Sequence, residues 1–200
     1  MGVRREGWVV RCLFALMVSV TRLSGLQAHE VVEQATAQQE AAPDAAAATS
    51  AVDTRGTWPR VHIPDPVAAK ALRAALDRAW MLLGESHCSR IVRDFSDRAG
   101  QSLESRLAGL EVQAQEYLTR LVFIDDSRNR TCVTGIIGFT QPGSRVIRLC
   151  VDEFKRTWQQ DQRHTVAALI HEMLHTLGLG ENPPSSNEIT KRVRSACRGR

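Results

Sequence analysis

The segment RHTVAALIHEMLHTLG (residues 163–178) is the feature that most restricts how this chain can fold. Its length and its apolar spacing predict a helix, and Gly178 follows where a residue able to take a left-handed conformation commonly ends one. The helix is apolar around two histidines and a glutamate, through Val166, Leu169, Ile170, Met173, Leu174 and Leu177. Burying a carboxylate and two imidazoles without partners is costly, and a bound metal would supply the missing partner.

The spacing His-Glu-x-x-His places the polar residues of this helix where a metal site needs them. Positions i and i+4 share one helix face, so His171 and His175 can both point at one ion. Glu172 is rotated by about 100° from His171, close enough to act on a zinc-bound water without binding the ion itself. Zn²⁺ lowers the pKa of its water to about 7, and a neighbouring carboxylate can then take the proton. We therefore predict a Zn²⁺ site with His171 and His175 as ligands and Glu172 as the catalytic base.

Two histidines leave the ligand set incomplete, and the third ligand has two candidates. No histidine follows His175, and the acids downstream are Glu181 and Glu188. Glu181 follows two glycines that let the chain turn back towards the metal, and we favour it. Glu188 would fall in the first turn of a further helix, where capping is its ordinary role. Either residue gives a His₂Glu set that leaves the fourth zinc position for water.

The first 28 residues predict export. They combine Arg4 and Arg5, a short apolar run (residues 12–20) and a small residue, Ala28, at a candidate cleavage point. They also carry +3 of the formal net charge of +4, through four arginines against one acid, so a nucleic-acid partner is not expected. An uncleaved leader stays open as an alternative to a signal peptide. We expect a secreted or periplasmic protein with no membrane contact after cleavage.

Four cysteines remain after the leader, and an even number in an exported domain predicts two disulfides. Cys132 and Cys150 flank a predicted hairpin, so we favour the pair Cys132–Cys150. The remaining pair, Cys88–Cys197, would then tie the C-terminal helix to the front of the domain. A cysteine zinc site is disfavoured because the sequence has no C-x-x-C pair.

Composition and periodicity divide the rest of the chain. Residues 29–57 are rich in Ala, Gln, Glu and Thr and predict a flexible linker. We expect a folded domain over 58–200, beginning with a helix after Asp65 and continuing through one or two helices within 85–119. Strands are predicted near 120–126, 132–139 and 145–151, with a short helix from 152. These elements predict an α+β domain in which the metal-binding helix packs on a short mixed or antiparallel sheet.

The segment HEMLHTLGLGE (residues 171–181) resembles the zincin metallopeptidases, with the H-E-x-x-H-x-x-G-x-x spacing of the metzincin branch. It departs from metzincins in having Glu181 where they have His, and in lacking a later methionine for a Met-turn. The wider stretch from FTQPGSRVIRLC to residue 190 is similar to small, exported, mostly bacterial proteins regarded as metallopeptidases. The resemblance implies a small zincin-like domain and an upstream edge strand that pairs with substrate, for which residues 144–150 are the candidate. An ordinary sheet edge is the alternative for those residues.

Two functions of different class remain. The first is an exported zinc metallopeptidase that hydrolyses peptide bonds through a zinc-bound water activated by Glu172. The second is a catalytically silent, zinc-stabilised binding or structural module. The first implies a peptide or protein substrate, and the sequence leaves the oligomeric state open.

Overall fold

The protein is described by a computed structural model that covers residues 58–199. The predicted signal peptide (1–28) and linker (29–57) lie outside the described residues, so both stay predictions. Among the helices that the structure describes, none combines the length and the apolar character that a membrane span requires.

A four-stranded mixed sheet forms one layer, in the order β1-β2-β4-β3. The strands are β1 (Arg60–His62), β2 (Val122–Asp125), β3 (Gly138–Phe139) and β4 (Val146–Leu149). β1, β2 and β4 run parallel, and β3 is antiparallel to β4. The side chains of Phe123, Ile147 and Leu149 are buried whereas Arg148 is exposed, so one face of the sheet lies against the core.

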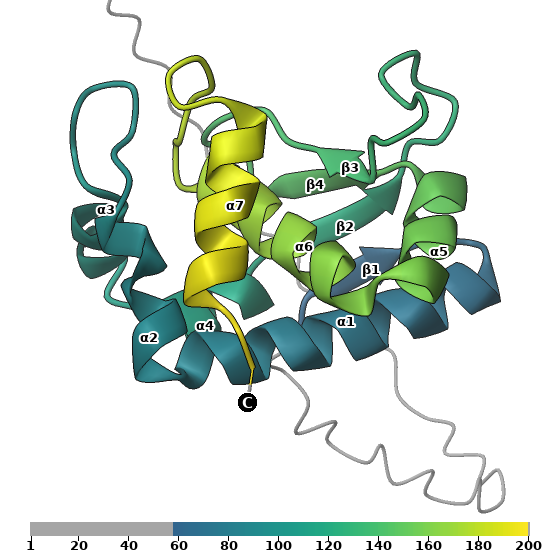
Figure 1. The fold of residues 1–200 in the computed structure, drawn as a ribbon, viewed down its shortest axis with the longest axis horizontal. Coiled ribbons are helices and arrows are strands. Elements are labelled where there is room, and N and C mark those ends of the chain that lie inside the picture. Colours follow the sequence, from purple (N-terminus) through teal and green to yellow (C-terminus); the bar gives the residue numbers. More distant parts are fainter. Residues whose placement is uncertain (1–57, 200) are drawn as a thin grey trace, which may run out of the picture. The chain divides into compact units, whose positions relative to one another are not determined.

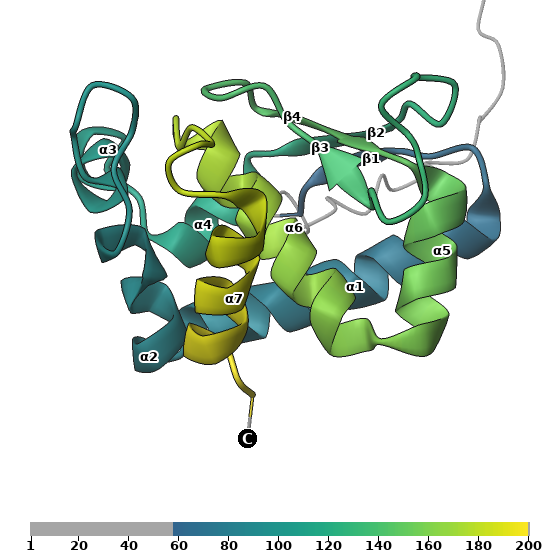
Figure 2. The ribbon, with the colours of Figure 1, turned by 45° about the horizontal axis from the view of Figure 1, so that its top comes forward.

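The helices form the second layer, on that buried face (Figures 1 and 2). The longest, α1 (Pro66–Gly84), begins where the Asp65 side chain accepts hydrogen bonds from the amides of Val67 and Ala68. It is followed by α2 (Ser86–Ser89), the 3₁₀ turn η1 (Arg90–Arg93), α3 (Leu103–Gly109) and α4 (Ala114–Thr119). The C-terminal helices are α5 (Val151–Gln160), α6 (Gln162–Thr176) and α7 (Ser186–Ala196).

Helix α6 is the central element of the domain. It packs against α1, α5 and α7, and it also contacts β3 and β4 of the sheet. Because it is surrounded, ten of its residues are buried, including both histidines of the His-Glu-x-x-His motif. The prediction of an α+β domain, in which this helix packs on a short mixed sheet, is confirmed.

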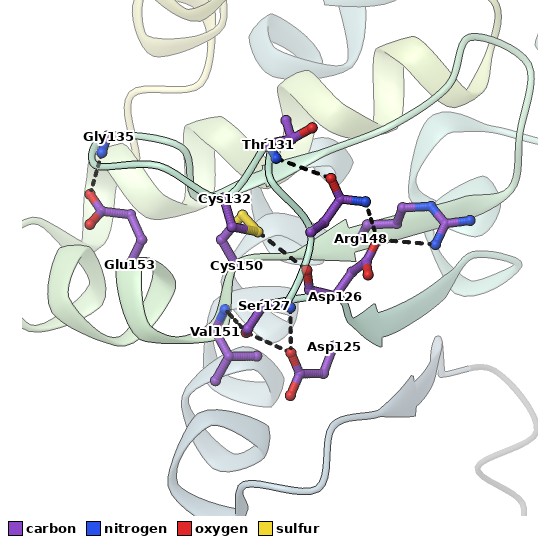
Figure 3. The surroundings of a disulfide bond; sticks show 11 residues. Asp125, Asp126, Ser127, Thr131, Cys132, Gly135, Arg148, Cys150, Val151 and Glu153 are labelled. Carbon is purple, nitrogen blue, oxygen red and sulfur yellow. Dashed lines mark hydrogen bonds and ion pairs between the residues drawn. A yellow bond between two sulfur atoms is a disulfide. The ribbon is translucent and has the colours of Figure 1, made fainter.

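Both predicted disulfides are present. Cys88 of α2 is bonded to Cys197, directly after α7, and Cys132 is bonded to Cys150, directly before α5. Figure 3 shows the second bridge inside a loop that is also held by hydrogen bonds. The Val151 amide donates to Ser127 Oγ (2.9 Å), and the Gly135 amide donates to a Glu153 carboxylate oxygen (2.9 Å). The loop 126–137 is therefore fixed to the start of α5 by covalent and polar contacts.

The predicted role of residues 144–150 as an edge strand is wrong. β4 lies between β2 and β3, and the edge of the described sheet on this side is the two-residue strand β3. β3 pairs only with Arg148 and Leu149, and Gly138 allows the close approach, because a Cβ there would lie 2.9 Å from the Arg148 carbonyl oxygen. At the start of β4, the side chain of Ser144 accepts from the Val146 amide at 3.2 Å, which removes a donor that a substrate strand would need.

Candidate metal centre

Hydrogen bonds at both ends of α6 fix the helix that carries the His-Glu-x-x-His motif. At its start, Asp161 is the N-cap and its side chain accepts from the His164 amide at 2.9 Å. At its end, Gly178 takes a positive φ of 106°, and its amide donates to the His175 carbonyl at 2.9 Å. This left-handed residue reverses the chain, so that residues 179–181 return alongside the last turn of α6.

The two histidines face each other at the centre of this arrangement. Their Nε2 atoms are 2.8 Å apart, and each side chain is only 5% exposed. The other ring nitrogens are already engaged, since His171 Nδ1 lies 2.8 Å from Thr190 Oγ1 and His175 Nδ1 lies 2.7 Å from the Leu179 carbonyl oxygen. A carbonyl can only accept, so His175 carries its proton on Nδ1, and its Nε2 keeps a free lone pair. Such fixed tautomers are typical of metal-binding histidines.

Glu181 approaches the same point from outside the helix. Its Oε1 atom lies 3.3 Å from His175 Nε2 and 3.5 Å from His171 Nε2. In a four-coordinate zinc site with bonds of 2.0–2.1 Å, neighbouring ligand atoms are about 3.3 Å apart. Both distances to Glu181 match that spacing, while the two histidine nitrogens would need to separate by about half an ångström. The three donors therefore lie close to the spacing of a metal-ligand set.

His171, Glu172 and His175 form a candidate metal-binding group, whose ligand atoms all lie within 4.8 Å of one another. The Glu172 Oε2 atom is buried and has no hydrogen-bond partner within the described residues. Thr140 faces this carboxyl and partly offsets the effect of burial, although the Thr140 hydroxyl is not aligned for a hydrogen bond. Glu172 thus adds a carboxylate that the local structure leaves free.

The burial of the group perturbs its protonation in the metal-free protein. Burial raises the pKa of Glu172 to about 8, and the nearby Glu181 carboxylate acts in the same direction. Burial also lowers the pKa of His171 to about 4, and the adjacent His175 adds to that effect. The metal-free site thus favours a neutral imidazole at His171, the form that binds a cation.

Glu188, the alternative third ligand, is directed elsewhere. Its amide donates to the side chain of Ser185, the N-cap of α7, and its carboxylate pairs with Arg192 one turn later. It is exposed, and no contact joins it to either histidine within residues 58–199. Of the two candidate ligands, the structure brings only Glu181 to the histidine pair.

We predict that Glu181→Ala lowers zinc affinity by at least about tenfold, while Glu188→Ala leaves it within about twofold. The first change removes one of three ligands, whereas the second removes an exposed ion pair. Competition titration with a fluorescent zinc chelator measures both affinities on the folded protein. Equal losses in the two variants would contradict the assignment of Glu181.

Thr190 is a site residue that the sequence analysis missed. It lies on α7, and its hydroxyl contacts His171 Nδ1, so it can fix the orientation of the imidazole. No local pattern distinguishes this threonine, because its role depends on how α7 packs beside α6. The Leu179 carbonyl was missed for the same reason, since every residue has a backbone carbonyl and the residue type does not show which one will accept.

Thr190→Val is expected to weaken zinc binding by about 10- to 100-fold, the usual effect of removing a hydrogen bond that orients a histidine ligand. Valine matches the shape of threonine, so the fold should be kept. Thr190→Ser retains the hydroxyl and provides the control, which should bind zinc nearly as the unmodified protein does. A loss of affinity as large in the serine variant would assign the effect to packing instead.

Tyr117 and His87 form no hydrogen bond or ion pair with the side chains of the metal group among the described residues. Tyr117 is buried, and its hydroxyl donates to the Thr176 carbonyl at 3.2 Å, which is a packing role. His87 lies 3.1 Å from Glu85 beside α2, far along the chain from the motif. His164 begins α6 and lines a separate cavity.

Comparison of the chain with known proteins gave no match among protein-family models, curated proteins or solved structures. The metal group of α6 is therefore the feature on which a functional assignment rests, and the resemblance to zincins extends only to the spacing of the His-Glu-x-x-His residues.

Proposed function

We propose that this chain is an exported zinc metallopeptidase that hydrolyses peptide bonds, with His171, His175 and Glu181 as zinc ligands and Glu172 as general base. The observation that carries the proposal is the convergence of His171 Nε2, His175 Nε2 and Glu181 Oε1, beside the buried Oε2 atom of Glu172, which has no hydrogen-bond partner among the described residues. Three protein ligands leave a fourth position for water or substrate, which distinguishes catalytic from structural zinc sites.

The chemistry divides between the metal and the protein. When bound, zinc would polarise both the attacking water and the substrate carbonyl. Glu172 would accept the proton of the attacking water on its free oxygen and then donate that proton to the leaving amine. Its ligand atom lies within 4.8 Å of those of both histidines, which is close enough for Glu172 to act on a molecule bound beside them. His171 Nδ1 would donate to the Thr190 hydroxyl and His175 Nδ1 to the Leu179 carbonyl, and these hydrogen bonds would hold both imidazoles with Nε2 towards the ion.

A second candidate function is a zinc-stabilised module without turnover. Four protein ligands would favour it, because structural zinc sites are closed. Glu172 argues for the enzyme, because a structural site has no use for a carboxyl beside the ligands whose Oε2 atom has no hydrogen-bond partner among the described residues. Its pKa, which burial raises to about 8, is also of the kind that clusters at functional sites. Export is supported by the two disulfides, which persist in oxidising compartments.

The proposal is tested by purifying the full chain under oxidising conditions, counting bound metal, and incubating it with a denatured protein. We expect about one zinc per chain, cleavage products visible by mass spectrometry, and loss of cleavage after zinc is removed with 1,10-phenanthroline. Activity should return when a stoichiometric amount of zinc is restored. Zinc binding without any cleavage would favour the structural module, and a protein that binds no zinc would exclude both functions.

A further inference from the structure

A second feature of the domain is a cavity lined in part by Thr190, the residue that contacts His171. It has a volume of about 930 Å³ and is lined by residues from α1, α6 and α7 and the segment after α7. Its lining runs along most of α7, from Asn187 to Ser195, and along the N-terminal half of α6. Figure 1 shows these two helices above α1. None of the residues His171, Glu172, His175 and Glu181 lines it. Cavities of this size are typical of small-molecule sites.

The lining of this cavity is strongly cationic. Five of its residues carry permanent positive charges, namely Arg78, Arg163, Lys191, Arg194 and Arg198, and no aspartate or glutamate is among the described residues that line it. Only Arg194 has an ion-pair partner among residues 58–199, at 3.6 Å from Asp161. Elsewhere in the domain, Arg93, Arg120, Arg148, Arg156 and Arg192 are each paired with a carboxylate, whereas other cations, such as Lys70 and Arg130, have no ion pair among the described residues. The cavity differs in bringing four such cations together around one concave space.

Helix periodicity explains why these charges gather. Asn187, Thr190, Lys191, Arg194 and Ser195 recur at spacings of three and four and therefore lie on one face of α7, which is the face that lines the cavity. Favourable interaction of cations with the helix macrodipole applies only to the last turn. It does not account for Arg78 on α1 or Arg163 on α6, which come from other elements and meet the α7 cations across the cavity.

We propose that this cavity binds a compact, multiply charged phosphate compound. Four unpaired cations around one concave space repel one another, and an anion relieves that repulsion. A phosphate group carries up to two negative charges in a small volume, and its oxygens accept paired hydrogen bonds from an arginine guanidinium. A carboxylate carries only one charge, so a ligand of the same charge would need more carboxylates and would be larger. The cavity floor adds Leu82, Val166, Ala167 and Ile170, which could contact an apolar part of the ligand. Its concave form favours a small ligand or headgroup over a nucleic-acid strand.

The test uses tripolyphosphate as the probe and isothermal titration calorimetry of the full chain in the metal-free state, so that its outcome does not depend on the proposed peptidase activity. We expect saturable binding of one tripolyphosphate per chain. The double variant Arg163→Gln/Lys191→Gln should weaken binding by at least about tenfold, because each residue contributes a charge at close range. Lys70→Gln/Arg130→Gln removes the same charge from exposed positions that do not line the cavity and should change affinity by less than about twofold.

A second arm distinguishes the sources of the phosphate. Binding to tripolyphosphate but not to phosphatidylcholine vesicles containing cardiolipin assigns the cavity to a soluble phosphate, whereas binding to both assigns it to a phosphorylated headgroup. The proposal is overturned if neither probe binds, if the control variant weakens binding as much as the cavity variant, or if a tri-aspartate peptide binds more tightly than tripolyphosphate. Circular dichroism of both variants confirms that they are folded before binding is compared.

Discussion

Glu172→Gln is expected to keep the metal and to lose peptide hydrolysis, with kcat lowered by about 10²- to 10⁴-fold, the range that general acid–base catalysis contributes. Glutamine has nearly the shape of glutamate but cannot accept a proton. The fold should tolerate the change, because burial raises the pKa of Glu172 to about 8 and already favours an uncharged side chain in the metal-free protein. Initial rates of peptide cleavage, compared at equal bound zinc, measure the effect.

Glu116→Gln is the matched control for this experiment. Glu116 lies on α4, is exposed, and pairs with Arg120 one turn later, so its removal should leave both zinc content and cleavage unchanged. Glu172→Asp keeps a carboxylate but shortens its reach and should retain more activity than the glutamine variant. Unchanged cleavage in Glu172→Gln would contradict the proposed general base, even if zinc binding proved correct.

Removing the Cys88–Cys197 disulfide is expected to lower the free energy of unfolding by about 5 kcal/mol at 25 °C, on the chain-entropy model. The bridge closes a loop with a sequence separation of 109 residues, so the unfolded chain gains much freedom when the bridge is absent. Alanine at both positions removes the bond without leaving free thiols. Urea denaturation, followed by circular dichroism, gives the change in unfolding free energy.

The second disulfide provides the internal comparison. Cys132 and Cys150 are separated by only 18 residues, so the same substitution there should lower the unfolding free energy by about 3 kcal/mol. This loop is also held by the Val151–Ser127 and Gly135–Glu153 hydrogen bonds, which remain when the sulfurs are removed. A larger loss at Cys132–Cys150 than at Cys88–Cys197 would show that native-state packing, not loop length, decides the contribution of each bridge.

The sequence predicted the parts of the fold that depend on local pattern. Asp65 and Pro66 mark the start of α1, and Gly178 follows the end of α6, because caps are decided by residues within one turn. The strand order was not predictable in the same way. β2 and β4 pair directly although 20 residues separate them in the sequence. β3 pairs with the other side of β4, which was predicted to be the edge of the sheet. β1 was missed because three residues are too few to show alternation.

The residues of the metal group also divide into those that local pattern predicts and those that only the fold brings together. His171, Glu172 and His175 were predictable because helix geometry alone brings them together. Glu181 required only that the chain reverse at Gly178. Thr190 could not be found, because its contact with His171 depends on the angle at which α7 packs beside α6. The cationic cavity was missed for the related reason that Arg78 and Lys191 are distant in sequence and meet only in the fold.

Helix α7 also determines when during biosynthesis the metal group can be completed. The metal-binding helix ends at Thr176, but the hydroxyl that holds His171 belongs to Thr190, and the helix that carries Thr190 is bonded at Cys197 to Cys88. A nascent chain that has reached only residue 181 therefore has all the proposed ligands without the contact that orients one of them. Full assembly of the group follows synthesis of α7 and oxidation of the two thiols, so a reduced chain would hold the histidines of the candidate metal group less firmly than the oxidised chain.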